Sequence, residues 1–224
     1  MRVYIGVDPR TPVSYNVLQW SIVRRSSRPV AIVPLVLPTL PISRAGLTDF
    51  TFSRFLPPAL SGYQGKSVFL DADMLMLGDV SELFDLATDE HSVWVVKNEK
   101  KFEWPSLMVF NNDQCRNLTP DFIEDETNNP ADFTWAESVG ELPAEWNFLV
   151  GYDQVGALPK LIHYTAGIPG FAETVSFDFA KEWINEKEAM NQNCSWLELM
   201  GDSVHAELVL NALQERKQSR AARH

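Results

Sequence analysis

The chain has 224 residues, a length that suits one α/β domain or two small ones, and 45% of the residues are hydrophobic, which is enough for a full core. Its formal net charge of −11 argues against non-specific binding to nucleic acid and to an acidic membrane face, because both demand a basic surface. Any anionic ligand would therefore need a local basic group or a metal ion.

The cysteines and the apolar segments favour a cytoplasmic protein. Cys115 and Cys194 are too few for a disulfide framework, and a reducing compartment is the simple interpretation, although one bridge stays open. The start of the chain, "MRVYIGVD", has the pattern of a core strand and not that of a secretory signal. The most apolar stretch, "PVAIVPLVLPTLP", is too short and too rich in proline to span a bilayer, so we expect no membrane segment.

A strand–helix–strand unit opens the chain. "RVYIGVD" (2–8) is an apolar run that predicts a buried strand. Thr11 followed by Pro12 is typical of a helix start, and apolar residues at helical spacing extend this helix to about Arg25. "PVAIVPLVL" (29–37) predicts the second strand, so we expect a parallel pair joined by a right-handed crossover.

Strands and short helices alternate through the middle of the chain. "DFTFSRFLPPALSG" (49–62) predicts a short helix halted by its two prolines, and "KSVFLDAD" (66–73) predicts the next strand. Asp79 with Glu82 resembles a capping box that opens a helix at "VSELFDLA". The next expected elements are strands at 92–98 and 106–112 and a helix starting within 118–126.

The last third is expected to be irregular at first and then helical. Residues 127–160 carry no clear periodicity, and "KLIHYTAG" (160–167) predicts a late strand. Helices are predicted at 176–190 and 203–217, with a frayed tail over about 215–224. We find no repeat and no linker, so the expectation is one α/β domain spanning 1–224 with a mainly parallel sheet.

Two carboxylates stand at the end of the strand at 66–73. Ligands of open α/β sheets bind beyond the carboxyl ends of the strands, and Asp71 and Asp73 occupy such an end. In an extended chain they point to the same side, where they repel each other unless a divalent cation binds. Hard oxygen ligands suit Mg²⁺ or Mn²⁺. The alternative interpretation is a pair of solvated aspartates that cap the following turn.

A histidine from a later strand could complete this site. His163 ends the strand within 160–167, so it could reach the same edge of the sheet. An imidazole ligand would favour Mn²⁺ over Mg²⁺. Alternatively, His163 is a hydrogen-bonded structural residue.

The set of motifs resembles the GT-A glycosyltransferases, and within them the retaining family-eight enzymes of the glycogenin-like and lipopolysaccharide galactosyltransferase-like type. The resemblance covers most of residues 1–170, with Arg54 of "FSRFL" standing 17 residues before Asp71. The other motifs that carry it are "YIGVDPR", "FLDADMLMLGDVSELF", "SLMVFNN", "LPAEWN" and "HYTAGIPGF". Their order and spacing are specific, whereas any single one would be a weak signal.

The resemblance implies a single-domain GT-A fold with helices flanking the sheet, and a metal-dependent transfer of a hexose with retention of configuration. Asp71, Asp73 and His163 would bind Mn²⁺ (or Mg²⁺), which grips the diphosphate of a UDP-sugar, with UDP-glucose or UDP-galactose as the donor. The acceptor, a glycan or a protein, is not identified. The nucleotide and donor sugar would be contacted by Gly6, Val7, Asp8, Arg10, Arg54, Ala72, Trp104, Ser106 and Gly167. Arg54 could instead make a surface salt bridge.

The sequence departs from the family pattern at three places. Ile168 and Pro169 stand where a lysine usually follows the late histidine and glycine, so phosphate binding would lean on the metal, on backbone N–H groups and on Arg10. Trp104-Pro105-Ser106 replaces the usual Asn-Ala/Ser-Gly, which puts the identity of the donor sugar in doubt. The usual Asp-Gln before "LPAEWN" is absent, and Glu137 lies nearby.

Retention can arise by double displacement on a carboxylate or by attack on the face from which the phosphate leaves. Glu137 is the first candidate for such a carboxylate and Asp153 the second, and the alternative for both is a solvated loop acid. The acceptor cleft could be built from aromatic residues in the late irregular segments. Alternatively, these side chains fill the core under the long loops, and we favour that alternative for each of Trp104, Trp135, Trp146 and Phe171.

Three other functions share some of these features; the inactive binding domain is the main alternative, the phosphatase is less favoured, and the nucleotidyltransferase is discounted. A haloacid-dehalogenase-type phosphatase also places Asp-x-Asp at a strand end, but Leu75 stands where its motif has Thr or Val. A nucleotidyltransferase expects a glycine-rich basic loop after the first strand, and "GVDPRTP" has one glycine. A catalytically inactive sugar-nucleotide-binding domain fits the missing lysine and the missing Asp-Gln.

Overall fold

The computed structural model describes residues 1–156, 158–191, 207–208, 210–212 and 214–215. By internal contacts the chain divides into two units, Met1–Lys187 and Glu188–His224. The first unit carries both sheets. The predicted helix at 203–217 lies mostly outside the described residues, and the seven described residues within it are helical. Among the described residues, no helix has both the length and the apolar character needed to cross a bilayer.

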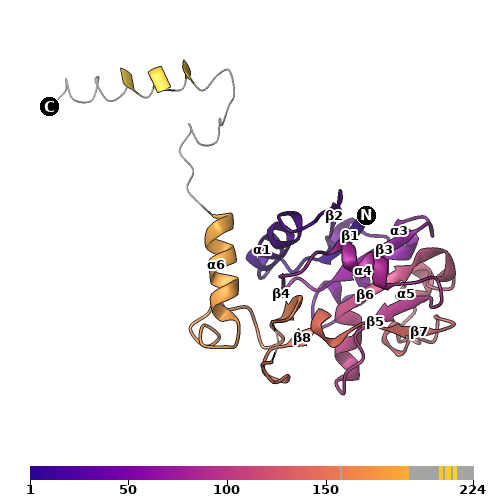
Figure 1. Ribbon diagram of the computed structural model, residues 1–224. Helices are drawn as coiled ribbons and strands as arrows, with labels where there is room; N and C mark the ends of the chain where they lie inside the picture. Colours follow the sequence, from indigo (N-terminus) through magenta and orange to yellow (C-terminus); the bar gives the residue numbers. More distant parts are fainter. Residues whose placement is uncertain (157, 192–206, 209, 213, 216–224) are drawn as a thin grey trace. The chain divides into compact units, whose positions relative to one another are not determined.

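The main sheet has six strands in the order β2-β1-β3-β6-β5-β7 (Figure 1). All neighbouring pairs are parallel except the two that involve β6, which runs opposite to the others. The sheet therefore confirms the predicted mainly parallel α/β fold. The strands are β1 Arg2–Gly6, β2 Ala31–Leu35, β3 Lys66–Leu70, β5 Val93–Val95, β6 Leu107–Asn111 and β7 Val139–Glu141.

Short helices and turns connect the strands. Helix α1 begins at Pro12 as predicted, although the side chain of Thr11 makes no capping hydrogen bond. The α-helices are α1 Pro12–Val23, α2 Phe50–Ser53, α3 Pro57–Leu60, α4 Ser81–Leu86, α5 Pro120–Glu124 and α6 Ala180–Met190. The 3₁₀ turns are η1 Leu37–Thr39, η2 Lys101–Ser106, η3 Asn112–Gln114, η4 Pro130–Asp132 and η5 Ala144–Trp146.

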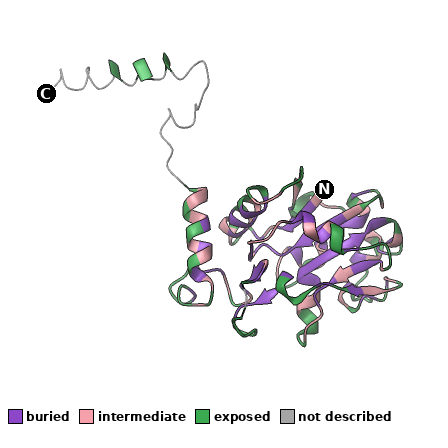
Figure 2. Ribbon diagram, viewed as in Figure 1, coloured by how far each residue is buried: buried purple, intermediate pink, exposed green. Residues whose placement is uncertain are grey.

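The central strand β3 is buried on both faces of the sheet (Figure 2). Its side chains alternate: Val68 and Leu70 belong to one apolar cluster with Leu18 of α1, and Phe69 belongs to a second cluster with Phe55. Period-two alternation sends successive side chains to opposite faces, so a strand covered on both sides reads as an uninterrupted apolar run.

Two expectations for the connecting segments were wrong. The predicted helix at 49–62 is two helices, because Pro57 opens α3 instead of only stopping α2; a proline is tolerated in the first helical turn, where its missing N–H is not needed. The segment 127–160, expected to be irregular, contains β7 and the short strand β8, Phe148–Leu149. Val139 of β7 pairs with Val93 of β5, and this non-local pairing leaves no apolar run in the sequence.

A second, three-stranded sheet has the order β4-β9-β8. Strand β4, Met74–Met76, follows the paired aspartates directly, and β9, Leu161–His163, pairs with it in antiparallel orientation. Helix α1 contacts β4, as Figure 1 also shows. Because Met74 lies opposite His163, this small sheet brings the late histidine to the end of the Asp-x-Asp motif.

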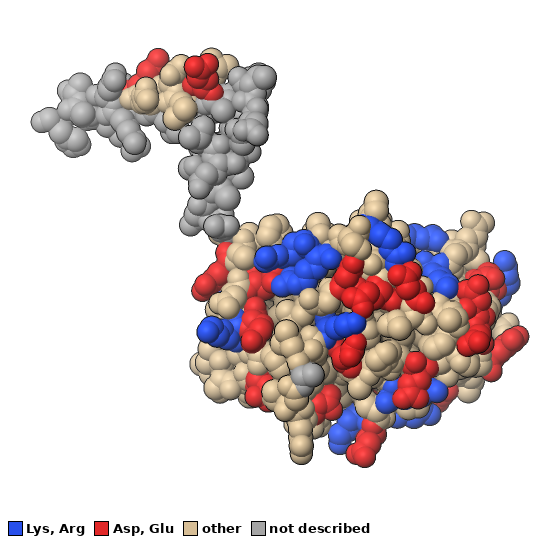
Figure 3. All heavy atoms as spheres, in the orientation of Figure 1, with Lys and Arg blue, Asp and Glu red and all other residues tan. Residues whose placement is uncertain are grey.

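Charged side chains of both signs lie on the surface, and one of the two cysteines lies in the core. On the face drawn in Figure 3, acidic and basic side chains of the described residues are interspersed. Cys115 is buried, with its sulfur 3.3 Å from the carbonyl oxygens of Ser92 and Asn111. Cys194 lies outside the described residues.

Two of the aromatic residues considered for an acceptor cleft are core residues. Trp146 is fully buried in the first apolar cluster and Trp135 is buried in the second, whereas Phe171 is exposed.

We predict that Trp146→Ala lowers the free energy of unfolding by about 3–5 kcal/mol, the usual cost of emptying a large buried site. Phe171→Ala should change it by less than about 0.5 kcal/mol. Urea unfolding followed by circular dichroism measures both, and equal losses would contradict this assignment.

Candidate functional site

The paired aspartates lie in the turn between β3 and β4. Strand β3 ends at Leu70, and the chain turns at Ala72 and Asp73, so a turn and not an extended strand brings the two carboxylates together. Asp71 is buried, and its N–H donates to the carbonyl of Ser106 at 3.0 Å. The carbonyl of Asp73 accepts from the N–H of Tyr164 at 2.9 Å. Both aspartates are therefore fixed through their backbone.

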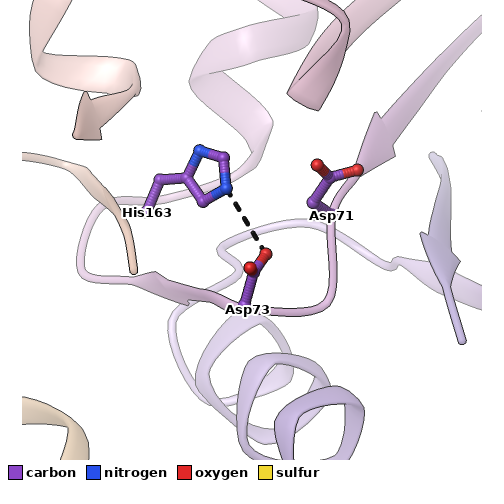
Figure 4. Close-up of side chains that lie close together, drawn as sticks. All are labelled: Asp71, Asp73 and His163. Carbon is purple, nitrogen blue, oxygen red and sulfur yellow. Dashed lines mark ion pairs between the residues drawn. The ribbon is translucent and has the colours of Figure 1, made fainter. Parts of the chain in front are cut away.

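His163 points at these carboxylates from β9 (Figure 4). Its Nε2 lies 3.4 Å from Oδ1 of Asp73. One donor atom from each of Asp71, Asp73 and His163 falls within 4.8 Å of the other two. Two carboxylate oxygens and one imidazole nitrogen at this spacing form a set that suits Mn²⁺ or Mg²⁺.

Three buried polar atoms of the cluster make no hydrogen bond, although two of them lie within ion-pair distance of Arg54 or His163. Oδ1 of Asp71, Oδ1 of Asp73 and Nδ1 of His163 are buried and make no hydrogen bond. Burying such groups without compensation is costly, and a cation among them would remove that cost for the oxygens. The residues present therefore fit a divalent metal ion, which the family resemblance implied.

The pKa values of the cluster show the same charge conflict. Burial raises the pKa of Asp71 to about 7, opposed by the Arg54 guanidinium and reinforced by the Asp73 carboxylate. For His163, burial alone would lower the pKa, but the carboxylates of Asp73, Asp71 and Glu103 outweigh it and the pKa is raised. Burial of Asp71 and the carboxylates around His163 thus both favour the protonated forms of these two side chains.

Arg54 is the basic group beside this cluster. It follows α2, and its Nη2 lies 3.2 Å from Oδ1 of Asp71. The side chains of both residues are mostly buried, so this is not the surface salt bridge considered as the alternative. Its Nε donates to the carbonyl of Phe50 at 3.3 Å, which fixes the guanidinium in place.

A cavity of about 440 Å³ opens over the cluster. Arg54, Asp71, Asp73 and His163 all line it. The other lining residues are Leu47, Thr48, Phe50, Thr51, Phe55, Phe102, Glu103, Pro105, Ala131, Tyr152 and Thr165. This hollow is large enough for part of a small-molecule ligand.

The residues expected beside the nucleoside lie at the end of β1. Gly6 is in close contact with the ring of Phe50, since a Cβ added there would lie 2.4 Å from that ring. The N–H of Val7 donates to the carbonyl of Leu35 at 3.2 Å. Asp8 and Arg10 form an ion pair at 2.6 Å, and the hydrogen bond from Arg10 lowers the pKa of Asp8. None of these four residues lines the cavity.

The other four residues that were expected to contact the sugar-nucleotide donor do not line the cavity either. Ala72 is buried between the aspartates. The indole N–H of Trp104 donates to the carbonyl of Asn98 at 3.0 Å, so this ring is held away from the ligand space. Ser106 is fully buried and its hydroxyl accepts from Asn147. Gly167 has a φ of +109°, which a residue with a side chain rarely adopts.

The two candidate catalytic carboxylates are not brought to the cluster. Glu137 is exposed and lies just before β7. Asp153 lines a separate hollow of about 420 Å³ with Asn98 and Asn147, and its Oδ2 accepts from the N–H of Leu149 at 2.8 Å. Neither lines the cavity over the aspartates.

Sequence reasoning missed several residues that do line this cavity. Glu103, Phe102 and Tyr152 are the most informative, because they bring a third carboxylate and two exposed aromatic rings to the cavity. Glu103 stands directly before Trp104-Pro105-Ser106, where the sequence departs from the family pattern. That departure was the available signal, but only the conformation of η2 shows where the carboxylate points.

Comparison with known proteins identifies the family. The model of glycosyl transferase family 8 matches residues 39–119, which include Arg54 and both aspartates. "Protein CDI" of Arabidopsis thaliana is 34% identical over 228 residues, covering 85% of this chain and 87% of that protein.

Solved structures show the same fold at low sequence identity. The apo WbbM bifunctional glycosyltransferase has a TM-score of 0.61 at 16% identity, covering 94% of this chain and 51% of its own, so the chain spans about half of WbbM. The glycosyltransferase GlyE of Streptococcus pneumoniae has a TM-score of 0.60 at 16% identity, covering 96% of this chain and 64% of its own.

The galactosyltransferase LgtC, solved with donor and acceptor sugar analogues, has a TM-score of 0.58 at 10% identity, covering 87% of this chain and 98% of its own. These structural matches show the fold alone. The family is shown by the Arabidopsis thaliana relative, which is 34% identical over 85% of this chain. The chain belongs to glycosyl transferase family 8 and is a glycosyltransferase with the GT-A fold.

Proposed function

We propose that this glycosyltransferase moves a hexose from a UDP-sugar, either UDP-glucose or UDP-galactose, to a glycan or protein acceptor with retention of configuration. In this proposal Asp71, Asp73 and His163 hold a divalent cation, Mn²⁺ or Mg²⁺. One observation carries it: three metal-type donor atoms converge within 4.8 Å, with buried carboxylate oxygens that make no hydrogen bond, in a cavity of a family 8 chain.

The cluster residues and the cation have separate tasks. When bound, the cation would neutralise the negative charge that develops on the departing diphosphate. Asp71 and Asp73 would hold it through fixed carboxylate oxygens, and the imidazole of His163 favours Mn²⁺ over Mg²⁺. The turn at Ala72 and the pairing of β4 with β9 keep the three donors together before any ligand arrives.

Arg54 would contact the phosphate oxygens. Among the described residues that line the cavity, Arg54 is the only one with a lysine or arginine side chain. A guanidinium fixed by Asp71 and the carbonyl of Phe50 presents its remaining N–H groups in one orientation. Such a planar fork matches the geometry of phosphate oxygens. Arg10, the basic group suggested by the sequence, is exposed and already paired with Asp8.

The nucleoside would lie toward the end of β1. Gly6 packs against Phe50, which lines the cavity, and Arg10 donates to the carbonyl of Leu47, another lining residue, at 3.3 Å. These contacts join the end of β1 to the cavity wall and support the proposed contacts of Val7 and Asp8 with the base. For Ala72, Trp104, Ser106 and Gly167, a direct contact with the donor stays a proposal.

Retention by attack on the face from which the phosphate leaves fits this cavity better than double displacement on Glu137 or Asp153. Both carboxylates lie outside the cavity, and Asp153 is committed to the N–H of Leu149. They stay candidates for a nucleophile only by resemblance.

The acceptor would enter past Phe102 and Tyr152. Both rings line the cavity and are more than half exposed, at 65% and 53%. The apolar C–H face of a sugar stacks on such rings, which otherwise expose apolar surface to water. They replace Trp135 and Trp146, which fill the core.

We predict that Asp73→Asn lowers turnover about a thousandfold, because it removes several kcal/mol of charge stabilisation in the transition state. Donor turnover is measured as release of nucleoside diphosphate with and without added Mn²⁺. Asp89→Asn serves as the control. The side chain of Asp89 is 85% exposed, pairs with Lys66 and does not line the cavity. An Asp73→Asn enzyme that stays active after chelation of all metal would refute the metal-dependent mechanism.

The predicted effect of Arg54→Ala separates phosphate binding from metal binding. The dissociation constant of UDP should rise about tenfold to a hundredfold, the range for hydrogen bonds to charged groups. The affinity for Mn²⁺ alone should not fall, because the substitution removes a positive charge beside Asp71. Calorimetric titration measures both constants. A parallel loss of both affinities would show that Arg54 supports the fold of the site instead.

A donor panel tests the identity of the nucleotide. UDP-glucose and UDP-galactose should raise the melting temperature of the protein in the presence of Mn²⁺ and not in its absence, since only a ligand of the folded state stabilises it. GDP-mannose is the matched control. An equal shift with GDP-mannose would contradict the choice of uridine, and shifts independent of Mn²⁺ would contradict the role of the cation.

A further inference from the structure

We infer that Glu103 is a positioning residue for the metal site: its carboxylate accepts the Nδ1–H of His163 and so aims Nε2 of that ring at the cation. The inference rests on the proposed metal role of Asp71, Asp73 and His163. It assigns a function to Glu103, which stands directly before Trp104-Pro105-Ser106, the segment at which this chain departs from the family pattern.

The imidazole of His163 lies between two carboxylates. Its Nε2 faces Asp73 at 3.4 Å, and its Nδ1 faces Oε2 of Glu103 at 3.8 Å. Glu103 is the only acid of the described chain recorded within 4.0 Å of Nδ1. This distance is longer than a hydrogen bond, so the inference requires the glutamate carboxylate to move closer to Nδ1 when the metal ion is bound.

The buried Nδ1 needs an acceptor once Nε2 carries a metal ion. A neutral histidine that ligates through Nε2 has its proton on Nδ1, and this N–H must be satisfied. In the structure Nδ1 is buried and has no hydrogen-bond partner. Metal-ligating histidines almost always donate their second N–H to a carboxylate, a carbonyl or water, which fixes the tautomer and the ring orientation. The carboxylate of Glu103 lies where that acceptor is required.

Ser106 fixes Glu103 and Asp71 together. Its hydroxyl donates to the carbonyl of Glu103 at 2.5 Å, and its own carbonyl accepts from the N–H of Asp71 at 3.0 Å. The same hydroxyl accepts from Asn147 at 2.9 Å, and Trp104 is tied to Asn98. The turn η2 therefore presents the glutamate from a frame that also holds a metal-ligating aspartate.

The charges of the cavity balance when Glu103 is ionised and a dication is bound. Among the described lining residues, Asp71, Asp73 and Glu103 carry three negative charges, and Arg54 carries one positive charge. A divalent cation supplies the two charges that are missing, and His163 stays neutral, as a ligand must. Glu103 is not part of the set of donor atoms that lie within 4.8 Å of one another, so it acts through His163 and not as a direct ligand.

The test compares Glu103→Gln with the wild type in titrations with Mn²⁺ alone, followed by the electron paramagnetic resonance signal of the free ion. The affinity should fall about tenfold to a hundredfold, the usual effect of changing a residue behind a metal ligand. Glu99→Gln is the control, since this exposed acid lies four residues earlier and loses the same charge; its Mn²⁺ affinity should match that of the wild type.

A double-mutant cycle with His163→Ala decides whether Glu103 acts through the imidazole. In that background Glu103→Gln should leave the remaining Mn²⁺ affinity unchanged. An equal loss with and without His163 would show that Glu103 acts by its charge or as a ligand, and the inference would be overturned. A loss of turnover by Glu103→Gln at unchanged Mn²⁺ affinity would also overturn it, because that is the behaviour of a nucleophile.

Ring ¹⁵N shifts give a readout that a purely structural role would not move. With only four histidines in the chain, the His163 signals can be assigned by substitution. In the presence of Mg²⁺, the wild type should show the Nδ1–H tautomer, and Glu103→Gln at the same Mg²⁺ concentration should show additional signals from His163 that is not bound to the metal. If Glu103→Gln does not fold, Glu103→Asp, which keeps the charge but withdraws the carboxylate, should weaken Mn²⁺ binding as well, and unchanged binding would overturn the inference.

Failure of the inference differs from failure of the proposed function. A wild type that binds no Mn²⁺ would refute the metal site itself. A wild type that binds Mn²⁺, together with a Glu103→Gln variant that binds it equally well, would refute only the role of Glu103.

Discussion

Negative charge gathered at the end of β3 is the constraint on which the site depends. Asp71 and Asp73 point at one imidazole in a largely buried place, and Glu103 faces the other side of the same ring. Such a group of acids is tolerated only if positive charge is supplied or if protons stay bound, and burial raises the pKa of Asp71 to about 7 although Arg54 and His163 oppose it. In the proposed function, a cation would supply this positive charge in a chain whose net charge is −11.

The small sheet β4-β9-β8 makes this convergence possible. It fixes His163 opposite Met74, one residue beyond Asp73, while Tyr164 donates to the carbonyl of Asp73. The main sheet supports the other side, since Asp71 directly follows the buried strand β3 and Ser106, the last residue of η2, directly precedes β6. Backbone hydrogen bonds thus hold the ligand side chains, and the cavity is formed before a ligand arrives.

The departures from the family pattern have a structural consequence. Ile168, near the position of the usual lysine, is a buried core residue, so no basic side chain replaces that lysine there. Arg54 is the arginine left at the cavity among the described lining residues. The replaced Asn-Ala/Ser-Gly segment forms the turn η2, in which Trp104 and Ser106 are bound internally while Glu103 faces the site. In the proposed function, phosphate and metal binding would therefore rely on a different distribution of charge around the same fold.

The sequence by itself determined the strand–helix–strand opening, the mainly parallel α/β class and the placement of Asp71 and Asp73 at a strand end, because uninterrupted apolar runs and proline positions are local signals. The predicted strand over 160–167 also indicated His163, whereas only the family resemblance indicated Arg54. Only the tertiary structure decided that Trp135 and Trp146 are core, that Glu137 and Asp153 lie away from the cavity, and that Glu103, Phe102 and Tyr152 line it. These outcomes depend on pairings between distant segments, such as β7 with β5 and β4 with β9, and the short strands β4 and β7 leave no periodic pattern in the chain.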